Sequence, residues 1–378
     1  MFADWQQFRI NGRRRYFLTK SPGFSAAWTL IAVWIAGQFN YAFAAIRVPL
    51  NVPSLTSQSD LIVRGQVVSV DGPVNNEMRG HVRVDHVLKG DWMKEEVTIT
   101  YPVPRPLGLL FDNLKQGEYG VFFLKQGGTT PVDPQNIKLL TSKGRPNASL
   151  DPSSPLSLVR EEILFTLSQP PSSVQVEAAL QLGYFPAEPR SIERLTELSI
   201  SQDRNLRGAA IVSLMRLNQI EALNPAIEYV LQAAPQQQRF RDYQAFSIWS
   251  SLVQGISGVR DSKAIEPLSE LLEHKDVELR RMAASALSHM EEGKAIPTLA
   301  HALNDTDQNV RYRAVMGLSG ITLNRKWGPA YAQFKENEQK YLDFWKQWWE
   351  TEGKAEFADQ EGQDQIDKGE ETAQGGAQ

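Results

Sequence analysis

The residues able to do acid–base or metal chemistry are few and dispersed. The chain has five histidines and no cysteine, which excludes disulfides, thiolate zinc sites and cysteine catalysis. His81 and His86 stand five residues apart in a segment of period two, so they point to opposite faces of a strand and cannot share a metal ion. His274, His289 and His301 fall in different expected helices, and none is followed by Glu. We therefore expect no catalytic centre, no metal site and no cofactor.

Other catalytic patterns are equally weak. Two pairs of adjacent acids, Glu161-Glu162 and Glu291-Glu292, stand at the ends of expected helices, where solvated carboxylates are commoner than catalytic ones. The sequence contains no phosphate-binding loop, no dinucleotide-binding glycine fingerprint and no Gly-x-Ser-x-Gly turn. The net charge of −4 argues against a dedicated nucleic-acid binder. The composition favours a binding protein rather than an enzyme.

Residues 1–44 have the features of an export signal. They carry five basic side chains and one acid, then an apolar run over 24–37, and end in Ala42-Phe43-Ala44, a small-x-small pattern that signal peptidase accepts. Cleavage near Ala44 would change the net charge from −4 to −8 and place the chain in the periplasm or cell envelope. An uncleaved anchor is the alternative, although the apolar run is shorter than the ~20 residues that span a bilayer. No later segment is long and apolar enough to span a membrane.

The basic part of this segment also suggests an export route. Arg14-Arg15-Tyr16-Phe17-Leu18 resembles the twin-arginine signal, in which two arginines are followed by any residue and then Phe-Leu. Thr19 departs from that pattern, and Lys20 comes one place late. The general secretory route therefore stays open.

Residues 45–145 alternate with period two and predict a small β-domain. Strand patterns occupy 60–70, 81–88, 96–101 and 119–124, separated by turn residues, which is typical of a small barrel or sandwich. Asp-Leu-Ile-Val-x-Gly-x-Val at 60–67 and Val-Leu-Lys-Gly at 87–90 resemble the OB-like barrel of netrin-like and metalloproteinase-inhibitor modules. Those inhibitors chelate zinc with an amino-terminal cysteine, which this chain lacks. The resemblance therefore implies the fold and not the inhibitory mechanism.

Residues 146–171 read as a polar linker with a leading helix at 156–167, and the sequence repeats beyond them. Asp-x-x-Leu/Val-Arg-x-x-Ala-x-x-x-Leu occurs three times, beginning at Asp203, Asp276 and Asp307. A second pattern, Ile-x-x-Leu/Val, interleaves with the first, and the spacings of 31 to 38 residues suit two antiparallel helices per unit. We expect an all-α solenoid of about five helix pairs over 172–351. The fold class is thus multidomain, with a β-domain followed by an α-solenoid.

This pattern resembles HEAT repeats, in the short subtype found in phycobilisome lyases and many bacterial repeat proteins. The resemblance implies that the Asp and Arg positions form a structural ladder between neighbouring repeats. Carried over to this sequence, the ladder consists of Asp203, Arg207, Asp276, Arg280, Asp307 and Arg311.

The repeats end in an aromatic segment, which contains Trp345, Trp348 and Trp349. A stack of repeats needs a cap at its open end, so a packing role is expected for these rings. An aromatic platform for sugar or peptide, centred on Trp348, is the alternative. Residues 352–378 then carry eight acids and two lysines, and this composition predicts a disordered tail.

These observations favour an exported, non-enzymatic scaffold that binds a protein partner on the concave face of the solenoid. Helical phase suggests exposed contacts at Glu266, Glu270, Glu273 and His301. The lyase resemblance alone implies an alternative, an accessory protein for bilin or tetrapyrrole attachment. The aromatic segment suggests another, a cell-wall or polysaccharide-binding protein that uses Trp348.

Overall fold

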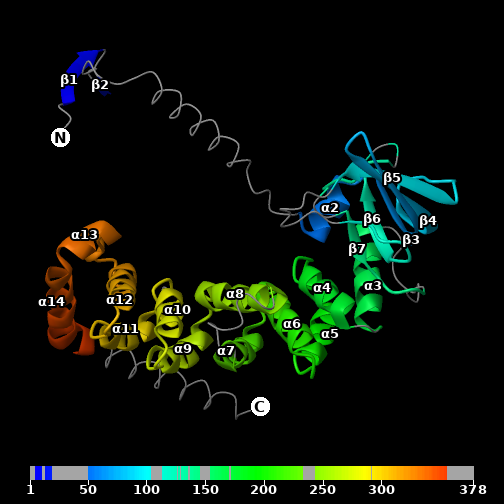
Figure 1. Cartoon of the computed structure of the whole chain (residues 1–378). Coiled ribbons are helices and arrows are strands. Elements are labelled where there is room, and N and C mark those ends of the chain that lie inside the picture. Colours follow the sequence, from blue (N-terminus) through cyan, green and yellow to red (C-terminus); the bar gives the residue numbers. More distant parts are fainter. Residues whose placement is uncertain are drawn as a thin grey trace, which may run out of the picture. The chain divides into compact units, whose positions relative to one another are not determined.

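The computed structural model describes residues 5–10, 13–18, 50–103, 113–125, 127, 129–134, 137–144, 154–169, 172–232, 243–290 and 292–355. The chain divides into two compact units, residues 1–49 and 50–378, which are described separately (Figure 1). No helix of the described residues combines the length and the apolar character needed to cross a bilayer.

In the first unit, strand β1 (Trp5–Ile10) pairs with β2 (Arg13–Leu18) in an antiparallel hairpin. The twin-arginine-like sequence lies on β2, where Arg14 is opposite Arg9. The apolar run over 24–37 and the expected cleavage site at Ala44 lie outside the described residues. The export signal stays a prediction.

The second unit begins with the β-domain. Its elements are α2 (Val52–Gln58), β3 (Leu61–Val74), β4 (Glu77–Lys89), β5 (Glu96–Pro102), β6 (Tyr119–Leu124) and β7 (Lys138–Leu140). The sheet order is β5-β4-β3-β6-β7, and every neighbouring pair is antiparallel. Three consecutive strands followed by a fourth beside the first form a Greek key, and five strands of this kind suit a partly open barrel. The predicted β-domain is therefore present.

Both faces of the central strands are buried. On β6, Phe122 faces one apolar cluster together with Val63 of β3, whereas Val121 and Phe123 face another together with Ile62. A strand buried on both faces has a continuous apolar sequence, which explains Val121 to Leu124. The second cluster continues without interruption into the helices that follow.

Twelve helices follow the sheet in the described residues. They are α3 (Pro155–Leu167), α4 (Ser172–Leu182), α5 (Pro189–Leu198), α6 (Arg204–Arg216), α7 (Leu223–Gln232), α8 (Tyr243–Gly258), α9 (Ile265–Leu272), α10 (Val277–Leu287), α11 (Ile296–Ala302), α12 (Gln308–Ile321), α13 (Tyr331–Glu336) and α14 (Glu338–Trp348). Each odd-numbered helix packs on the next even-numbered one, and the even-numbered helices stack on one another from α4 to α14. These helices thus form a two-layered α-solenoid, as the repeats predicted.

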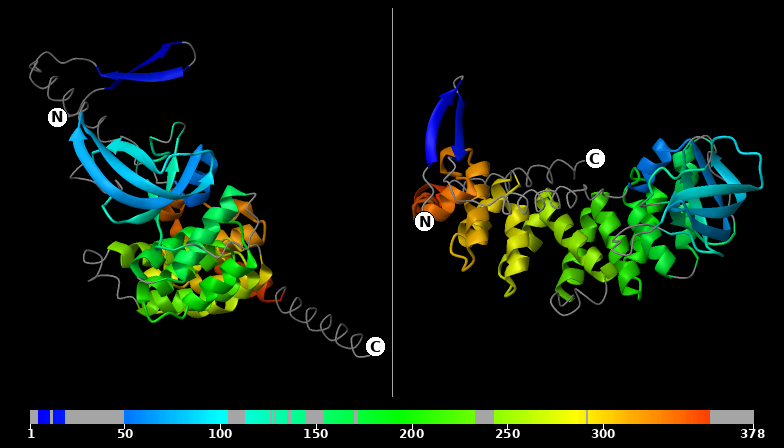
Figure 2. Two further views of the ribbon diagram at one scale, coloured as in Figure 1. Left: turned by 90° about the vertical axis from the view of Figure 1, so that its right-hand side faces the viewer. Right: turned by 45° about the horizontal axis from the view of Figure 1, so that its top comes forward.

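The stack begins earlier than the sequence suggested. Helix α3, which we placed in a linker segment, packs on α4 and contacts β4, and α4 contacts β7 (Figure 2). Among the described residues the helices therefore form six consecutive pairs, from α3–α4 to α13–α14. Most of the expected polar linker, residues 145–153, lies outside the described residues.

The repeat pattern is explained by its apolar positions. In α10, Leu279, Ala283 and Leu287 are buried, and the corresponding residues of α6 and α12 are buried as well. The spacing i, i+4, i+8 places them on one helix face, which packs in the common core. The period of the sequence therefore predicted the core of the solenoid correctly.

A buried ion pair joins the β-domain to the solenoid. Arg64 of β3 donates from Nε to Glu162 Oε2 of α3 at 2.7 Å, and both side chains are 2% exposed. Arg64 also donates from Nη2 to the Ser142 carbonyl oxygen at 2.8 Å and lies over the Tyr119 ring. The expectation that Glu162 is solvated was wrong, because its partner is 98 residues away in the sequence and could not be identified from local pattern.

This junction gives stability a dependence on pH. Burial raises the pKa of Glu162 to about 7, although Arg64 opposes the shift. A carboxyl group whose pKa is higher in the folded than in the unfolded chain stabilises the fold most below its unfolded pKa, and that stabilisation is lost as pH rises through about 7. We expect Glu162→Gln to remove this component, so that the variant gains roughly 2 kcal/mol relative to wild type between pH 5 and pH 8. Urea unfolding at several pH values measures it; a difference that stays constant with pH would contradict it.

Candidate functional site

The three repeated aspartates cap helices. Asp203 Oδ1 accepts from the Leu206 amide, and Asp276 Oδ1 accepts from the Glu278 amide, each at 2.9 Å. Asp307 Oδ1 accepts from the amides of residues 309 and 310 at 3.0 and 3.2 Å. A carboxylate at this position satisfies free backbone donors and favours the positive end of the helix dipole.

The three repeated arginines close their own loops. Arg207, Arg280 and Arg311 each donate from Nη1 to the backbone carbonyl oxygen six residues earlier, at 2.6, 3.0 and 2.6 Å. Since the same bond recurs in three repeats, it explains why arginine occurs four residues after the capping aspartate. The long guanidinium reaches back over the first helical turn to the preceding loop.

Ion pairs also join successive repeats, but between partners that differ from the expected ones. Arg280 makes a two-point contact with Asp305 at 2.7 and 3.1 Å, whereas the partner of Asp307 is Arg281, at 2.6 Å. Arg311 pairs with Glu338 of α14 at 2.6 Å. The hydrogen bond from Arg281 is the largest cause that lowers the pKa of Asp307.

Sequence reasoning therefore missed Arg281, Asp305 and Glu338. Two of them could have been found from spacing, because Arg281 directly follows a motif arginine and Asp305 precedes a motif aspartate by two residues. Glu338 carries no such signal, since it lies in the helix that ends the repeats.

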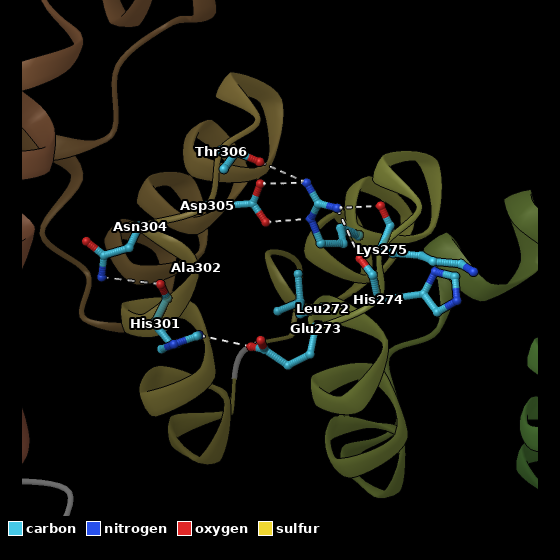
Figure 3. Close-up of a pocket in the computed structure, with 10 residues that line it drawn as sticks. Leu272, Glu273, His274, Lys275, His301, Ala302, Asn304, Asp305 and Thr306 are labelled. Atoms are coloured by element: carbon cyan, nitrogen blue, oxygen red, sulfur yellow. Dashed lines mark hydrogen bonds and ion pairs between the residues drawn. The ribbon is translucent and has the colours of Figure 1, made fainter.

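A cleft of about 390 Å³ opens between the α9–α10 and α11–α12 turns (Figure 3). Glu273 Oε1 and His301 Nδ1 meet across it at 3.0 Å, with side chains 66% and 71% exposed. The Arg280–Asp305 pair forms another wall, and its hydrogen-bonding groups are occupied by each other and by neighbouring loop atoms. The exposed polar side chains that line the cleft therefore include Glu273, His301, Lys275 and Asn304.

The structure brings together only two of the four predicted contact residues. Glu273 and His301 line the cleft, whereas Glu266 and Glu270 are exposed on α9 outside it. Within the described residues, no three His, Asp or Glu side chains are placed to hold a metal ion. His81 and His86 lie on β4; His81 contacts Asp71 and Thr98, and His86 is exposed.

The even-numbered layer presents a second candidate surface, which we call the polar stripe. Its residues recur every three or four positions, apart from the adjacent Tyr312 and Arg313, and are exposed or half-buried. They are Gln244, Ser247, Ser251 and Gln254 of α8; Glu278, Arg281 and Ser285 of α10, with His289 just after that helix; and Asn309, Tyr312, Arg313 and Met316 of α12. Even-numbered helices pack on one another more closely than odd-numbered ones do. In a curved stack the closely spaced layer is the inner one, so Glu266 and Glu270 belong to the outer layer.

The aromatic segment packs as the end of the stack. Trp345 is fully buried and donates from Nε1 to the Trp327 carbonyl oxygen at 3.1 Å. Trp348 is half-buried, edge-on to Trp345 at 5.4 Å between ring centroids. A π-helical turn (Trp349–Gly353) extends α14. Trp348 therefore takes part in packing, and its role in glycan binding stays a prediction.

These features define a class, repeat proteins with an α-solenoid, here preceded by a β-domain. More narrowly, residues 250–319 match the family model for HEAT repeats; this segment comprises the end of α8, α9 to α11 and most of α12. A search of curated protein sequences found no match.

Several solved structures resemble part of the chain. The complex of CpcE and CpcF of phycocyanin lyase from Nostoc sp. PCC7120 is 18% identical, with a TM-score of 0.33, over 48% of this chain and 70% of the other. A designed armadillo repeat protein in complex with a (KR)4 peptide is 16% identical, with a TM-score of 0.30, over 44% and 82%. An engineered protein is 18% identical, with a TM-score of 0.31, over 50% and 97%.

Proposed function

We propose that this protein is an exported, non-enzymatic scaffold that binds a protein partner along the inner layer of its HEAT repeats. The observation that carries the proposal is the polar stripe, which continues over three successive even-numbered helices. Stacked helix pairs build an extended surface of this kind without an active-site pocket.

The chemistry of the stripe suits a polypeptide. Its members on α8 are amides and hydroxyls, which can donate to and accept from a partner's backbone and polar side chains. Tyr312 adds an aromatic contact on α12, where it packs edge-on against Tyr331 at 5.0 Å. Interfaces are enriched in tyrosine, which gives a large contact area together with a polar end.

A non-enzymatic role fits how the solenoid uses its charged groups. The repeated aspartates cap helices, and the repeated arginines close loops and join repeats. Both side chains of the Glu273–His301 pair are exposed to solvent, whereas catalytic acid–base groups are usually at least partly buried. The proposal of export rests on residues 1–44 of the sequence.

Charged residues introduced into the stripe test the proposal. We expect Gln254→Arg together with His289→Arg to weaken partner capture at least tenfold. The two arginines would replace the side chains that the partner's surface complements. Both positions are exposed, so folding should be unchanged. The comparison variant is Glu266→Lys with Glu270→Lys on the outer layer. Loss of capture in that variant alone would move the contact to the α9 surface.

A further inference from the structure

Three exposed cations lie near Trp327 in sequence or in space at the last helix pair. Arg325 and Lys326 belong to the short 3-10 helix η4 (Arg325–Trp327), and Lys340 lies on α14. The Lys340 ammonium is 5.6 Å from the centre of the Trp327 ring, which stacks on Phe344 at 3.8 Å. In the part of the chain that the structure describes, no ion pair engages these three cations. We call this set the cation–aromatic surface.

The described part of the chain ends just beyond the C-terminal end of α14. Gly353 is buried, and a Cβ there would be 2.7 Å from Trp349 Cε3 and 2.8 Å from Trp348 Cζ3, so the backbone is held tightly against these rings. Trp348, Phe344 and Lys340 follow one another at four-residue spacing, which places them along one side of α14. Lys340 is thus at one end of this row of side chains, and the last described residues lie beyond its other end.

The residues that follow are complementary in charge. Residues 356–378 contain seven acids and one lysine and lie outside the described residues. Lys340 and Ala355 are 15 residues apart along α14 and the helical turns that extend it, so about 22 Å of helix separates them. An extended chain covers that length in about seven residues. Asp364 and the acids that follow it can accordingly reach Lys340.

We propose that residues 356–378 bind to the cation–aromatic surface of the same chain through their acidic side chains. Individual exposed ion pairs are weak. Here, however, the acids are covalently tethered to the helix that carries Lys340, and a short tether gives an effective concentration in the millimolar range. The inference goes beyond the scaffold function, because this surface lies outside the polar stripe and the proposed contact does not involve the protein partner.

Local acids do not occupy the same cations. Asp343, the closest carboxylate to Phe344 in sequence, accepts from Gln339 Nε2 at 2.7 Å. Glu338 is engaged by Arg311 and by Gln308. The proposed contact between residues 356–378 and the cation–aromatic surface is electrostatic and exposed, so it should weaken strongly as the salt concentration rises.

Zero-length carbodiimide cross-linking of the full-length chain tests the proposal. We expect Lys326 and Lys340 to cross-link to acids of residues 356–378 at low salt, with yields reduced at least threefold at 1 M NaCl. Arg325→Glu should reduce both cross-links at least threefold, although it removes no cross-linking amine. Arg260→Glu, at another exposed arginine, is the matched control and should leave the yields unchanged.

Mixing isotopically labelled and unlabelled chains distinguishes contacts within one chain from contacts between copies. Cross-links confined to single-isotope pairs are expected. Mixed-isotope pairs, equal yields to lysines elsewhere such as Lys263 and Lys275, or yields unaffected by Arg325→Glu would each overturn the proposal.

Discussion

Replacement of Arg64 by methionine is expected to lower the free energy of unfolding by about 3–5 kcal/mol. The variant leaves the Glu162 carboxyl group buried without its partner and the Ser142 carbonyl oxygen without its donor. Because Arg64 lowers the pKa of Glu162 in the folded chain, its loss should raise that pKa further, so that the pH-dependent decrease in stability continues to higher pH. Urea unfolding followed by circular dichroism measures both effects.

The double variant Arg64→Met/Glu162→Leu is the control. Replacing both members of a buried pair by apolar groups of similar size is often neutral or stabilising, so most of the lost stability should return. Since one apolar core runs from β6 through α3 into the repeats, the signals of sheet and helices should be lost in a single transition. A cost below about 1 kcal/mol for the single variant would show that the pair does not hold the junction together.

Trp345→Ala is expected to cost about 3–5 kcal/mol, in the range of large aromatic truncations in a core. The ring is fully buried, donates to the Trp327 carbonyl oxygen, and packs between Phe344 and Trp348. The matched control is Trp348→Ala, on the same helix and half-buried, for which a clearly smaller loss is expected.

Thermal unfolding of the two tryptophan variants separates packing from ligand binding. If Trp348→Ala cost as much as Trp345→Ala, the two rings would have equal packing roles. If Trp348→Ala left stability unchanged but abolished retention on insoluble glycans, the polysaccharide-binding alternative would be supported instead.

The sequence predicted the solenoid well because its signals are local. Leu279, Ala283 and Leu287 recur at the helical period and are all buried, and Asp276 provides the helix cap that its position indicates. Each repeat contacts mainly its neighbours, so a pattern within about 30 residues is enough to specify it.

The junction between the two parts of the second unit could not be predicted in this way. The sequence indicated α3 only as a leading helix. The residues that it packs on lie in other elements, β4 and α4, and the pattern within α3 does not reveal those contacts. Arg64 and Glu162 are 98 residues apart, and an arginine in a strand gives no sign of where its partner lies. Helix α2 was missed although Asn51 caps it at 2.9 Å and Pro53 stands in its first turn, since the segment is short and adjoins a strand.

The candidate site was predicted in part for the same reason. Helical phase correctly identified Glu266, Glu270, Glu273 and His301 as exposed. It could not say which of them face one another, nor which layer of the stack is the more closely spaced. That distinction comes from contacts between helices in different repeats, and it shifts attention from α9 to the polar stripe.

The most direct test of the scaffold proposal is cross-linking of the mature chain to its partners in its own cell envelope, with the contact sites mapped by mass spectrometry. A visible absorbance spectrum of the same sample reports any bound pigment. We expect a colourless sample in which one envelope protein is enriched and its cross-links fall on α8, α10 and α12. A coloured sample, or a sample without any enriched protein, would contradict the proposal.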